Sequence, residues 1–126
     1  MAFSWADYLG LAKRLAAEDG EAEQRTAISR AYYSAFNQAH AWLQLNTRLT
    51  LAPGRMHEQV WEAFRGGSPS AVEIYKDGDR LKKKRHVADY KVPFEGALVF
   101  DKGHAIQLAT KLTHALTALR KADVPG

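Results

Sequence analysis

Apolar side chains recur every three to four residues along most of the chain, which is the period of an amphipathic α-helix. The clearest run covers residues 21–45, where no glycine or proline interrupts the pattern. Glycine and proline pairs mark breaks on both sides of a shorter run at 56–65. We therefore predict five helices, at residues 4–19, 21–45, 56–65, 70–91 and, after a cap at Asp101 or Gly103, up to residue 122.

The ends of these helices are predicted from local capping signals. Ser4 with Asp7, and Ser70 with Glu73, have the spacing of a capping box at a helix N-terminus. Gly20 follows the first apolar run and is the expected glycine C-cap of that helix.

Two helices and one connection fit this scheme less simply. The third helix is expected to bury Val60 and either Trp61 or Phe64. Gly78 lies in the middle of the fourth helix, where a glycine lowers helix stability by about 1 kcal/mol relative to alanine and so makes the helix prediction weaker. Residues 94–100 end in three apolar residues that could pass for a strand, but the chain offers no second strand to pair with it. We predict a loop there, docked on the helices by its apolar side chains.

Short connections between long amphipathic helices favour antiparallel neighbours. We therefore predict an all-α fold in which residues 1–126 form a single domain, an up-and-down bundle of four to five helices. Its composition, 46% hydrophobic and 25% charged, is that of a globular protein and not of a disordered one.

Composition also excludes several kinds of chemistry. The chain has no cysteine, which excludes disulfides, thiolate metal sites and a cysteine nucleophile. Its five histidines show no metal-ligand spacing, and no glycine-rich phosphate loop is present, so we expect no metal and no cofactor. We see no signal peptide and no run long enough to span a membrane, and we predict a cytoplasmic location.

The net charge of +4 is unevenly distributed. Four of its basic side chains, followed at once by Arg85, crowd into one part of the fourth helix: Arg80, Lys82, Lys83 and Lys84. Such a cluster raises the local potential and favours a polyanion such as RNA. The alternative is a solvated helix face that keeps the protein in solution.

The second helix carries a further stripe, roughly opposite its apolar one. Thr26, Arg30, Tyr33 and Asn37 follow one another at spacings of four, three and four. This combination suits a contact with another helix, a symmetric dimer interface or a polyanion site. The alternative is an arginine and a tyrosine that simply lie along the surface.

Arg85 on the fourth helix also does not fit a plain helical bundle. It follows Leu81 by four and precedes Ala88 by three, so it points toward the apolar face. Asp89 is one turn further on, at the spacing of a bidentate ion pair. The pair either fixes the helix end or holds Arg85 ready to bind a phosphate.

Two segments are informative when they are taken together: RTAISRAYYSAF at residues 25–36 and RHVADY at residues 85–90. They resemble the small stand-alone branch of the HEPN family. The first is similar to its R-x-A-x-S-R-A-Y-Y-x-A-F helix, and the second to its R-x-x-A-D-Y element. The resemblance implies a bundle of four or five helices that is usually a homodimer. It also implies a minimal nucleotidyltransferase as partner, in a toxin–antitoxin-like pair.

Many HEPN proteins are metal-independent RNases, in which an arginine is followed at a short spacing by a histidine. Arg85 matches that arginine, but the positions expected for the histidine hold Tyr90, Lys91 and Val92. In an active enzyme Arg85 would stabilise the charge that develops on the phosphate, and His86 or Tyr90 would move the proton.

Three hypotheses follow for the function. The first is an RNA- or nucleotide-binding module that works with a nucleotidyltransferase, the second a metal-independent endoribonuclease, and the third a non-catalytic structural or interaction bundle. The residues expected to bind are Arg30, Tyr33, Asn37, Arg80, Lys82, Lys83, Lys84 and Asp89.

Overall fold

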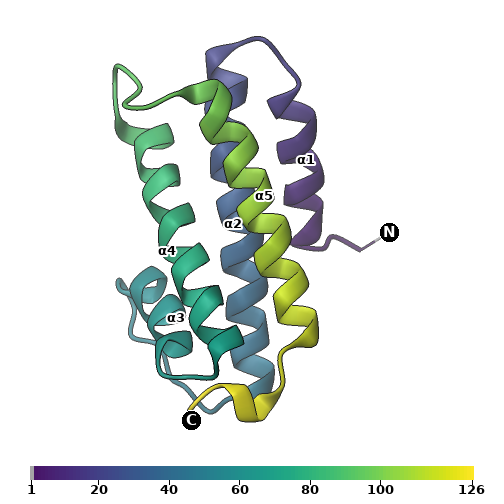
Figure 1. The fold of residues 1–126 in the computed structure, drawn as a ribbon, viewed down its shortest axis with the longest axis vertical. Coiled ribbons are helices and arrows are strands. Elements are labelled where there is room, and N and C mark those ends of the chain that lie inside the picture. The colour runs from purple at the N-terminus through teal and green to yellow at the C-terminus, as the bar shows by residue number, and fades with distance from the viewer. Residues whose placement is uncertain (1) are drawn as a thin grey trace.

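Four helices run alternately up and down one axis, and a fifth, of 10 residues, lies beside the lower half of one of them (Figure 1). The computed structural model describes residues 2–126 and, in that range, contains no strand. Its elements are α1 (Ala6–Ala16), α2 (Glu21–Asn46), α3 (Met56–Arg65), α4 (Pro69–Tyr90), α5 (Leu98–Ala118) and a 3-10 turn (Lys121–Asp123). This confirms the predicted all-α bundle. None of these helices combines the length and apolar character that a membrane crossing requires.

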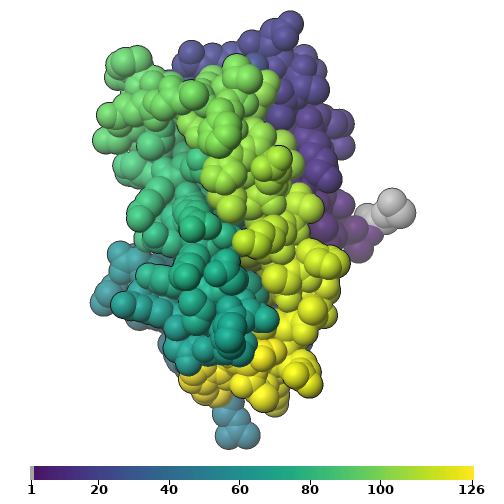
Figure 2. Space-filling model, in the orientation of Figure 1, coloured from purple at the N-terminus to yellow at the C-terminus, as the bar shows by residue number. Residues whose placement is uncertain are grey.

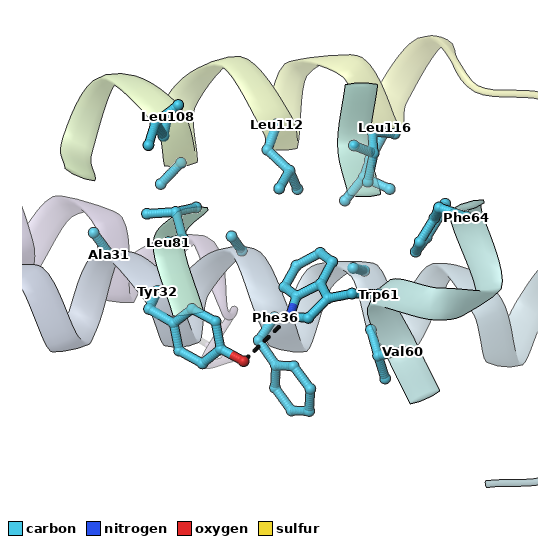
Figure 3. Packing of buried hydrophobic residues seen from close by; sticks show 14 of the residues in the cluster. Ala31, Tyr32, Phe36, Val60, Trp61, Phe64, Leu81, Leu108, Leu112 and Leu116 are labelled. Atoms are coloured by element: carbon cyan, nitrogen blue, oxygen red, sulfur yellow. Dashed lines mark hydrogen bonds between the residues drawn. The ribbon is translucent and has the colours of Figure 1, made fainter. Parts of the chain in front are cut away.

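The longest helix, α2, is the centre of the bundle and contacts α1, α3, α4 and α5. In the view of Figure 2, α4 and α5 form the near surface and cover α2. On the α2 side that faces its neighbours, four alanines at helical spacing are fully buried: Ala27, Ala31, Ala35 and Ala39. Small side chains let the neighbouring helices approach closely, and leucines from the facing helices fill the space above them (Figure 3).

The short helix α3 packs against both α2 and α4. This packing explains why more of its side chains are buried than the sequence predicted. We expected either Trp61 or Phe64 to be buried, but both are, together with Val60. A helix that packs on two neighbours buries a wider stripe than one that packs on a single neighbour. The Trp61 indole lies directly against Gly78, where any Cβ would overlap its ring. Gly78 is therefore a packing position in a stable helix.

Two predicted caps are wrong in position. Gly20 has an ordinary negative φ and is the N-cap of α2, while α1 has already ended at Ala16. The α4 cap is Ser68, whose hydroxyl accepts the Ala71 N–H at 3.3 Å, and not the Ser70 box. Pro69 occupies the first helical position, where its missing N–H costs nothing.

The beginning of the first helix is only partly as expected. Ser4 donates its backbone N–H to the Asp7 carboxylate at 3.0 Å, which is one half of a capping box. The other half is absent, because the Ser4 hydroxyl accepts instead from Ala6 at 3.3 Å. The helix itself begins at Ala6.

The last helix begins earlier and ends earlier than predicted. Residues 98–100, expected in a loop, form the first turn of α5, with Val99 and Phe100 facing outward. Asp101 forms an ion pair with Lys84 at 2.8 Å, which connects this turn to α4. At the other end the helix stops at Ala118, and a 3-10 turn follows in place of the residues predicted to be helical up to 122.

Candidate phosphate-binding site

The two segments that carry the family resemblance lie side by side, because the start of α2 meets the end of antiparallel α4. The Arg25 guanidinium donates to the carbonyl oxygens of Ala88 at 3.2 Å and Lys91 at 2.7 Å. Ala88 lies in the last turn of α4 and Lys91 is its C-cap, where carbonyl oxygens have no hydrogen-bond partner within the helix. Arg25 is thus a capping residue that joins the two helices.

One turn further along, Ser29 and Asp89 connect the same helices. The Ser29 hydroxyl donates to Asp89 Oδ2 at 3.3 Å and accepts from Arg30 Nη2 at 3.4 Å. The Arg30 guanidinium lies over two rings, at 4.7 Å from the Tyr8 centroid and 5.2 Å from the Tyr33 centroid. Arg30 and Tyr33 were predicted as site residues from the outer stripe of α2. Arg30 contacts the same hydroxyl that binds Asp89, and Tyr33 contacts Arg30.

Arg85 is held mainly by aromatic rings. Its guanidinium lies 5.4, 5.6 and 5.7 Å from the centroids of Tyr32, Tyr33 and Tyr90, within the range of cation–π attraction. The side chain is only 12% exposed, and its Nε is buried without a hydrogen-bond partner among the described residues. Its orientation toward the apolar face is as predicted.

The predicted bidentate pair of Arg85 with Asp89 is not formed. A single contact joins Nη1 to Oδ2 at 3.8 Å, which is too long for a hydrogen bond. Asp89 Oδ2 is instead within reach of the Ser29 hydroxyl. Arg85 therefore keeps its hydrogen-bonding capacity for another acceptor.

A histidine that the sequence analysis did not select lies in the same group. His57, at the start of α3, has its Nδ1 2.6 Å from the Tyr32 hydroxyl and its ring stacked on Phe36 at 4.2 Å. Burial lowers the pKa of His57, and the positive charges of Arg85 and Lys82 lower it further. No spacing in the sequence relates His57 to Arg85, because the two meet only through the packing of α3 against α2 and α4.

The basic run of α4 is not a single patch. Arg80 pairs with Asp77 at 3.2 Å, and Lys83 with Asp79 at 2.9 Å. Lys84 turns toward α5, where it pairs with Asp101. Among residues 2–126, Lys82 alone in this run has no carboxylate within 4.0 Å.

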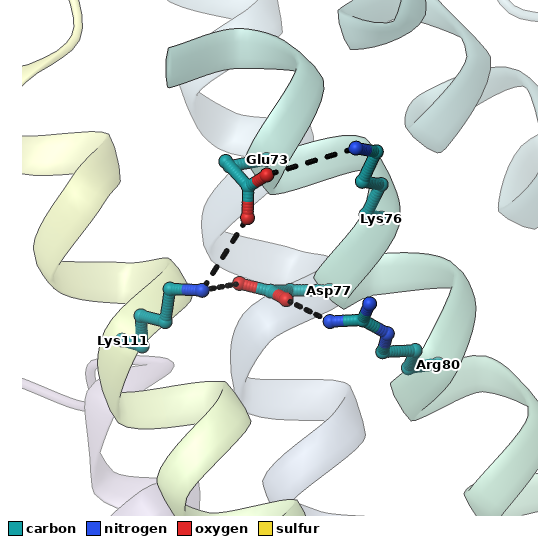
Figure 4. Close-up of polar contacts among 5 residues, drawn as sticks. All are labelled: Glu73, Lys76, Asp77, Arg80 and Lys111. Atoms are coloured by element: carbon teal, nitrogen blue, oxygen red, sulfur yellow. Dashed lines mark hydrogen bonds and ion pairs between the residues drawn. The ribbon is translucent and has the colours of Figure 1, made fainter. Parts of the chain in front are cut away.

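The Arg80 pair is part of a structural ion network between α4 and α5 (Figure 4). The Asp77 side chain is 2% exposed and lies 3.1 Å from Lys111 Nζ on α5. A buried carboxylate needs such partners, because leaving it unpaired in the interior is costly. Arg80, which was predicted to bind RNA, is one partner of this network, while its side chain stays 56% exposed.

Two of the remaining predicted residues lie at the rim of the site, and the third lies apart from it. His86 and Tyr90 are exposed neighbours, with ring centroids 5.1 Å apart. Asn37 donates to the Tyr33 carbonyl of its own helix at 2.9 Å and does not join the group.

A shallow hollow of about 340 Å³ lies on the outer side of α4 and is lined by Asp79, Lys82, Lys83, Arg85, His86 and Val87.

We call the residues that converge here the Arg85 site: Ser29, Arg30, Tyr32, Tyr33, His57, Lys82, Arg85 and Asp89. The site combines three permanent positive charges with one carboxylate and two tyrosine rings. Within the described part of the chain, no group of histidine and carboxylate side chains is arranged to hold a metal ion.

Comparisons of the chain with protein-family models, with curated proteins and with solved structures found no match. The HEPN resemblance stays a prediction from the two segments. The physical properties of the Arg85 site therefore carry the functional argument.

Proposed function

We propose that the Arg85 site binds the phosphate groups of RNA or of a nucleotide. The observation that supports this most is Arg85 itself, a nearly buried guanidinium oriented by three tyrosine rings, with no carboxylate at hydrogen-bonding distance. A guanidinium fixed in this way can offer two parallel N–H donors to one phosphate, with little loss of side-chain freedom on binding.

Residues at the rim suit a nucleic acid better than an isolated inorganic anion. Tyr90 is 64% exposed and lies beside His86, so both rings can stack on unpaired bases. Lys82 adds a positive charge that no carboxylate neutralises in the described chain. We therefore favour single-stranded RNA as the ligand, with its phosphate on Arg85 and a base on Tyr90.

A purely structural role for Arg85 is less well supported. The ends of α2 and α4 are already joined by Arg25, which caps α4, and by the hydrogen bond from Ser29 to Asp89. The contact from Arg85 to Asp89 at 3.8 Å adds little to these. A buried arginine with an unpartnered Nε is a cost to the fold, which ligand binding would offset.

Metal-independent cleavage of RNA stays a second prediction. Tyr90 lies over the Arg85 guanidinium, and His86 is next to Tyr90, so both residues named as proton carriers are beside the arginine. The same RNA incubated with the protein in a chelating buffer tests this hypothesis. Products that disappear in Arg85→Ala would support cleavage, and intact RNA would leave a binding module.

The nucleotidyltransferase partner and the homodimer are proposals that rest on the family resemblance. The outer stripe of α2, from Thr26 to Asn37, is the face we assign to self-association. Tyr33→Glu introduces a charge there, beside Arg30, and is expected to give monomers in light scattering. An unchanged mass for a folded Tyr33→Glu protein would exclude this face.

The binding proposal is tested by fluorescence anisotropy with a labelled single-stranded RNA, and in a separate arm with a nucleoside monophosphate. Arg85→Ala is expected to weaken RNA binding at least about tenfold, which corresponds to about 1.4 kcal/mol. Lys121→Ala changes an exposed lysine in the 3-10 turn at the opposite end of the bundle. It is the control, and it should leave RNA binding unchanged.

The salt dependence of RNA binding gives a second test. If three phosphates are neutralised, the logarithm of the association constant should fall linearly with the logarithm of the salt concentration, with a slope of about −2. Equal affinities for wild type and Arg85→Ala would contradict the proposal.

A further inference from the structure

The hydrogen bonds around the buried Tyr32 hydroxyl determine which ring nitrogen of the neighbouring His57 carries the proton. The indole N–H of Trp61 can only donate, and it donates to the Tyr32 oxygen at 3.2 Å (Figure 3). Tyr32 is fully buried, so its own hydroxyl hydrogen also needs an acceptor inside the protein. The only other partner of this hydroxyl in the described chain is His57 Nδ1, at 2.6 Å.

Tyr32 must therefore donate to His57 Nδ1, and that nitrogen must be unprotonated. In the reverse arrangement, Nδ1–H would donate to the tyrosine oxygen, and the buried hydroxyl hydrogen would be left without an acceptor. A neutral imidazole with an unprotonated Nδ1 carries its proton on Nε2. The packing of Tyr32 and Trp61 thus selects the Nε2–H tautomer.

The Nε2 atom is available to a ligand. It makes no hydrogen bond within the described residues, yet it is not among the side-chain nitrogens that are buried without a partner. It therefore reaches the surface. The ring lies 5.8 Å from Tyr33, the same ring that the Arg85 guanidinium contacts at 5.6 Å.

We propose that His57 is a neutral hydrogen-bond donor of the Arg85 site, whose Nε2–H binds a non-bridging oxygen of the phosphate that Arg85 holds. This inference rests on the proposed function and names a further ligand-contacting residue for it. It also assigns His57 a role other than general base, because Nε2 already carries the proton. The ligand class it implies is a phosphate ester, with oxygens that accept from an imidazole and a guanidinium together.

The charges around His57 keep it in this state. Burial against Phe36 disfavours the imidazolium form most, and the positive charges of Arg85 and Lys82 on α4 disfavour it further, so these effects together lower its pKa. The ionisable neighbours from α2 are Tyr32 and Tyr33. Burial raises the pKa of Tyr32, which keeps that hydroxyl protonated and uncharged. Protonation at Nδ1 would in addition remove the acceptor of the Tyr32 hydroxyl.

The tautomer is measured directly on the wild-type protein by long-range ¹H–¹⁵N correlation spectra of the histidine rings at neutral pH. The expected result is an unprotonated Nδ1 and a protonated Nε2 on His57. Tyr32→Phe removes the donor and should allow both tautomers. A protonated Nδ1 in wild type, as the other tautomer or as the imidazolium, would overturn the proposal.

Three substitutions then test the role in binding. A glutamine amide can place an N–H near the Nε2 position, whereas an asparagine amide reaches only the Nδ1 position. His57→Gln is expected to bind the single-stranded RNA within about threefold of wild type, and His57→Ala and His57→Asn about tenfold more weakly. His114→Ala, an exposed histidine on α5, is the control and should bind as wild type does.

The outcomes separate this inference from the proposed function. Loss of RNA binding in Arg85→Ala, with unchanged binding in all three His57 variants, would leave the function standing and overturn the role of His57. Equal loss in His57→Gln and His57→Ala would also overturn it. Absence of RNA binding by the folded wild-type protein would refute the proposed function, and the role of His57 with it.

Discussion

The hydroxyl of Ser29 in α2 donates a hydrogen bond of 3.3 Å to the carboxylate of Asp89 in α4, a residue 60 positions further along the chain. This bond occupies the oxygen of Asp89 that lies closest to Arg85 and leaves a separation of 3.8 Å between carboxylate and guanidinium. Ser29 thereby restrains the residue that would otherwise compete with a phosphate for Arg85.

We predict that Asp89→Asn increases the affinity for RNA. The asparagine oxygen still accepts from Ser29, while the negative charge beside Arg85 is gone. The expected gain is severalfold in an anisotropy titration, with a change of at most about 1 kcal/mol in the free energy of unfolding. If Asp89 and Arg85 were only a structural pair, Asp89→Asn and Arg85→Ala would lose similar stability and neither would change RNA binding.

Two glycines inside helices are predicted to respond oppositely to alanine. At Gly78 a Cβ would overlap the Trp61 ring, so Gly78→Ala should destabilise the protein by about 1–3 kcal/mol. At Gly103, within α5, a Cβ meets no atom within 4 Å, so Gly103→Ala should stabilise it by about 0.5–1 kcal/mol. Urea denaturation of both variants measures this, and a gain in stability for Gly78→Ala would contradict the packing of α3 on α4.

The ion network between α4 and α5 gives a prediction with an internal control. Lys111→Ala removes one of the two partners of the buried Asp77 carboxylate. Because Lys111 itself is 58% exposed, we expect a loss of only about 1 kcal/mol in chemical denaturation. Lys76→Ala breaks only a half-exposed contact of 3.8 Å with Glu73 and should cost less than about 0.5 kcal/mol. Equal losses in the two variants would mean that Asp77 does not depend on Lys111.

The lowered pKa of His57 makes stability depend on pH in a defined direction. The unfolded chain, with an ordinary histidine pKa near 6.5, takes up the proton before the folded protein does, so stability decreases as the pH falls below that value. Urea unfolding midpoints at about pH 7.5 and 5.5 measure the effect. His57→Gln should reduce the decrease without abolishing it, because burial also lowers the pKa of His104. A midpoint that rises on acidification would contradict the neutral His57.

Sequence reasoning predicted some elements well because their signals are local. The bounds of α3 were correct, and α2 ended within one residue of the prediction, since both have a continuous apolar period between clear loop signals. The start of α5 was missed because Val99 and Phe100 are apolar but face outward, which breaks the expected pattern.

Only the part of the site that lies on one helix face was predicted, because contacts between helices leave no signal in the local sequence pattern. Residues that share a helix face, such as Arg30 with Tyr33, could be grouped from helical spacing alone. The ion pair of Lys84 could not be predicted, because its carboxylate partner, Asp101, is on another helix. His57 was missed because its position depends on tertiary packing, which leaves no periodic signal.

The Arg85 site is tested by titrating the ¹⁵N-labelled protein with the single-stranded RNA and following the chemical shifts of the backbone amides. We expect the shift changes to concentrate around Ser29–Tyr33, His57 and Lys82–Tyr90, and we expect Arg85→Ala to abolish them at the same RNA concentration. Shifts confined to the opposite end of the bundle, around the 3-10 turn at Lys121–Asp123, or identical shifts in Arg85→Ala, would contradict the assignment of the Arg85 site.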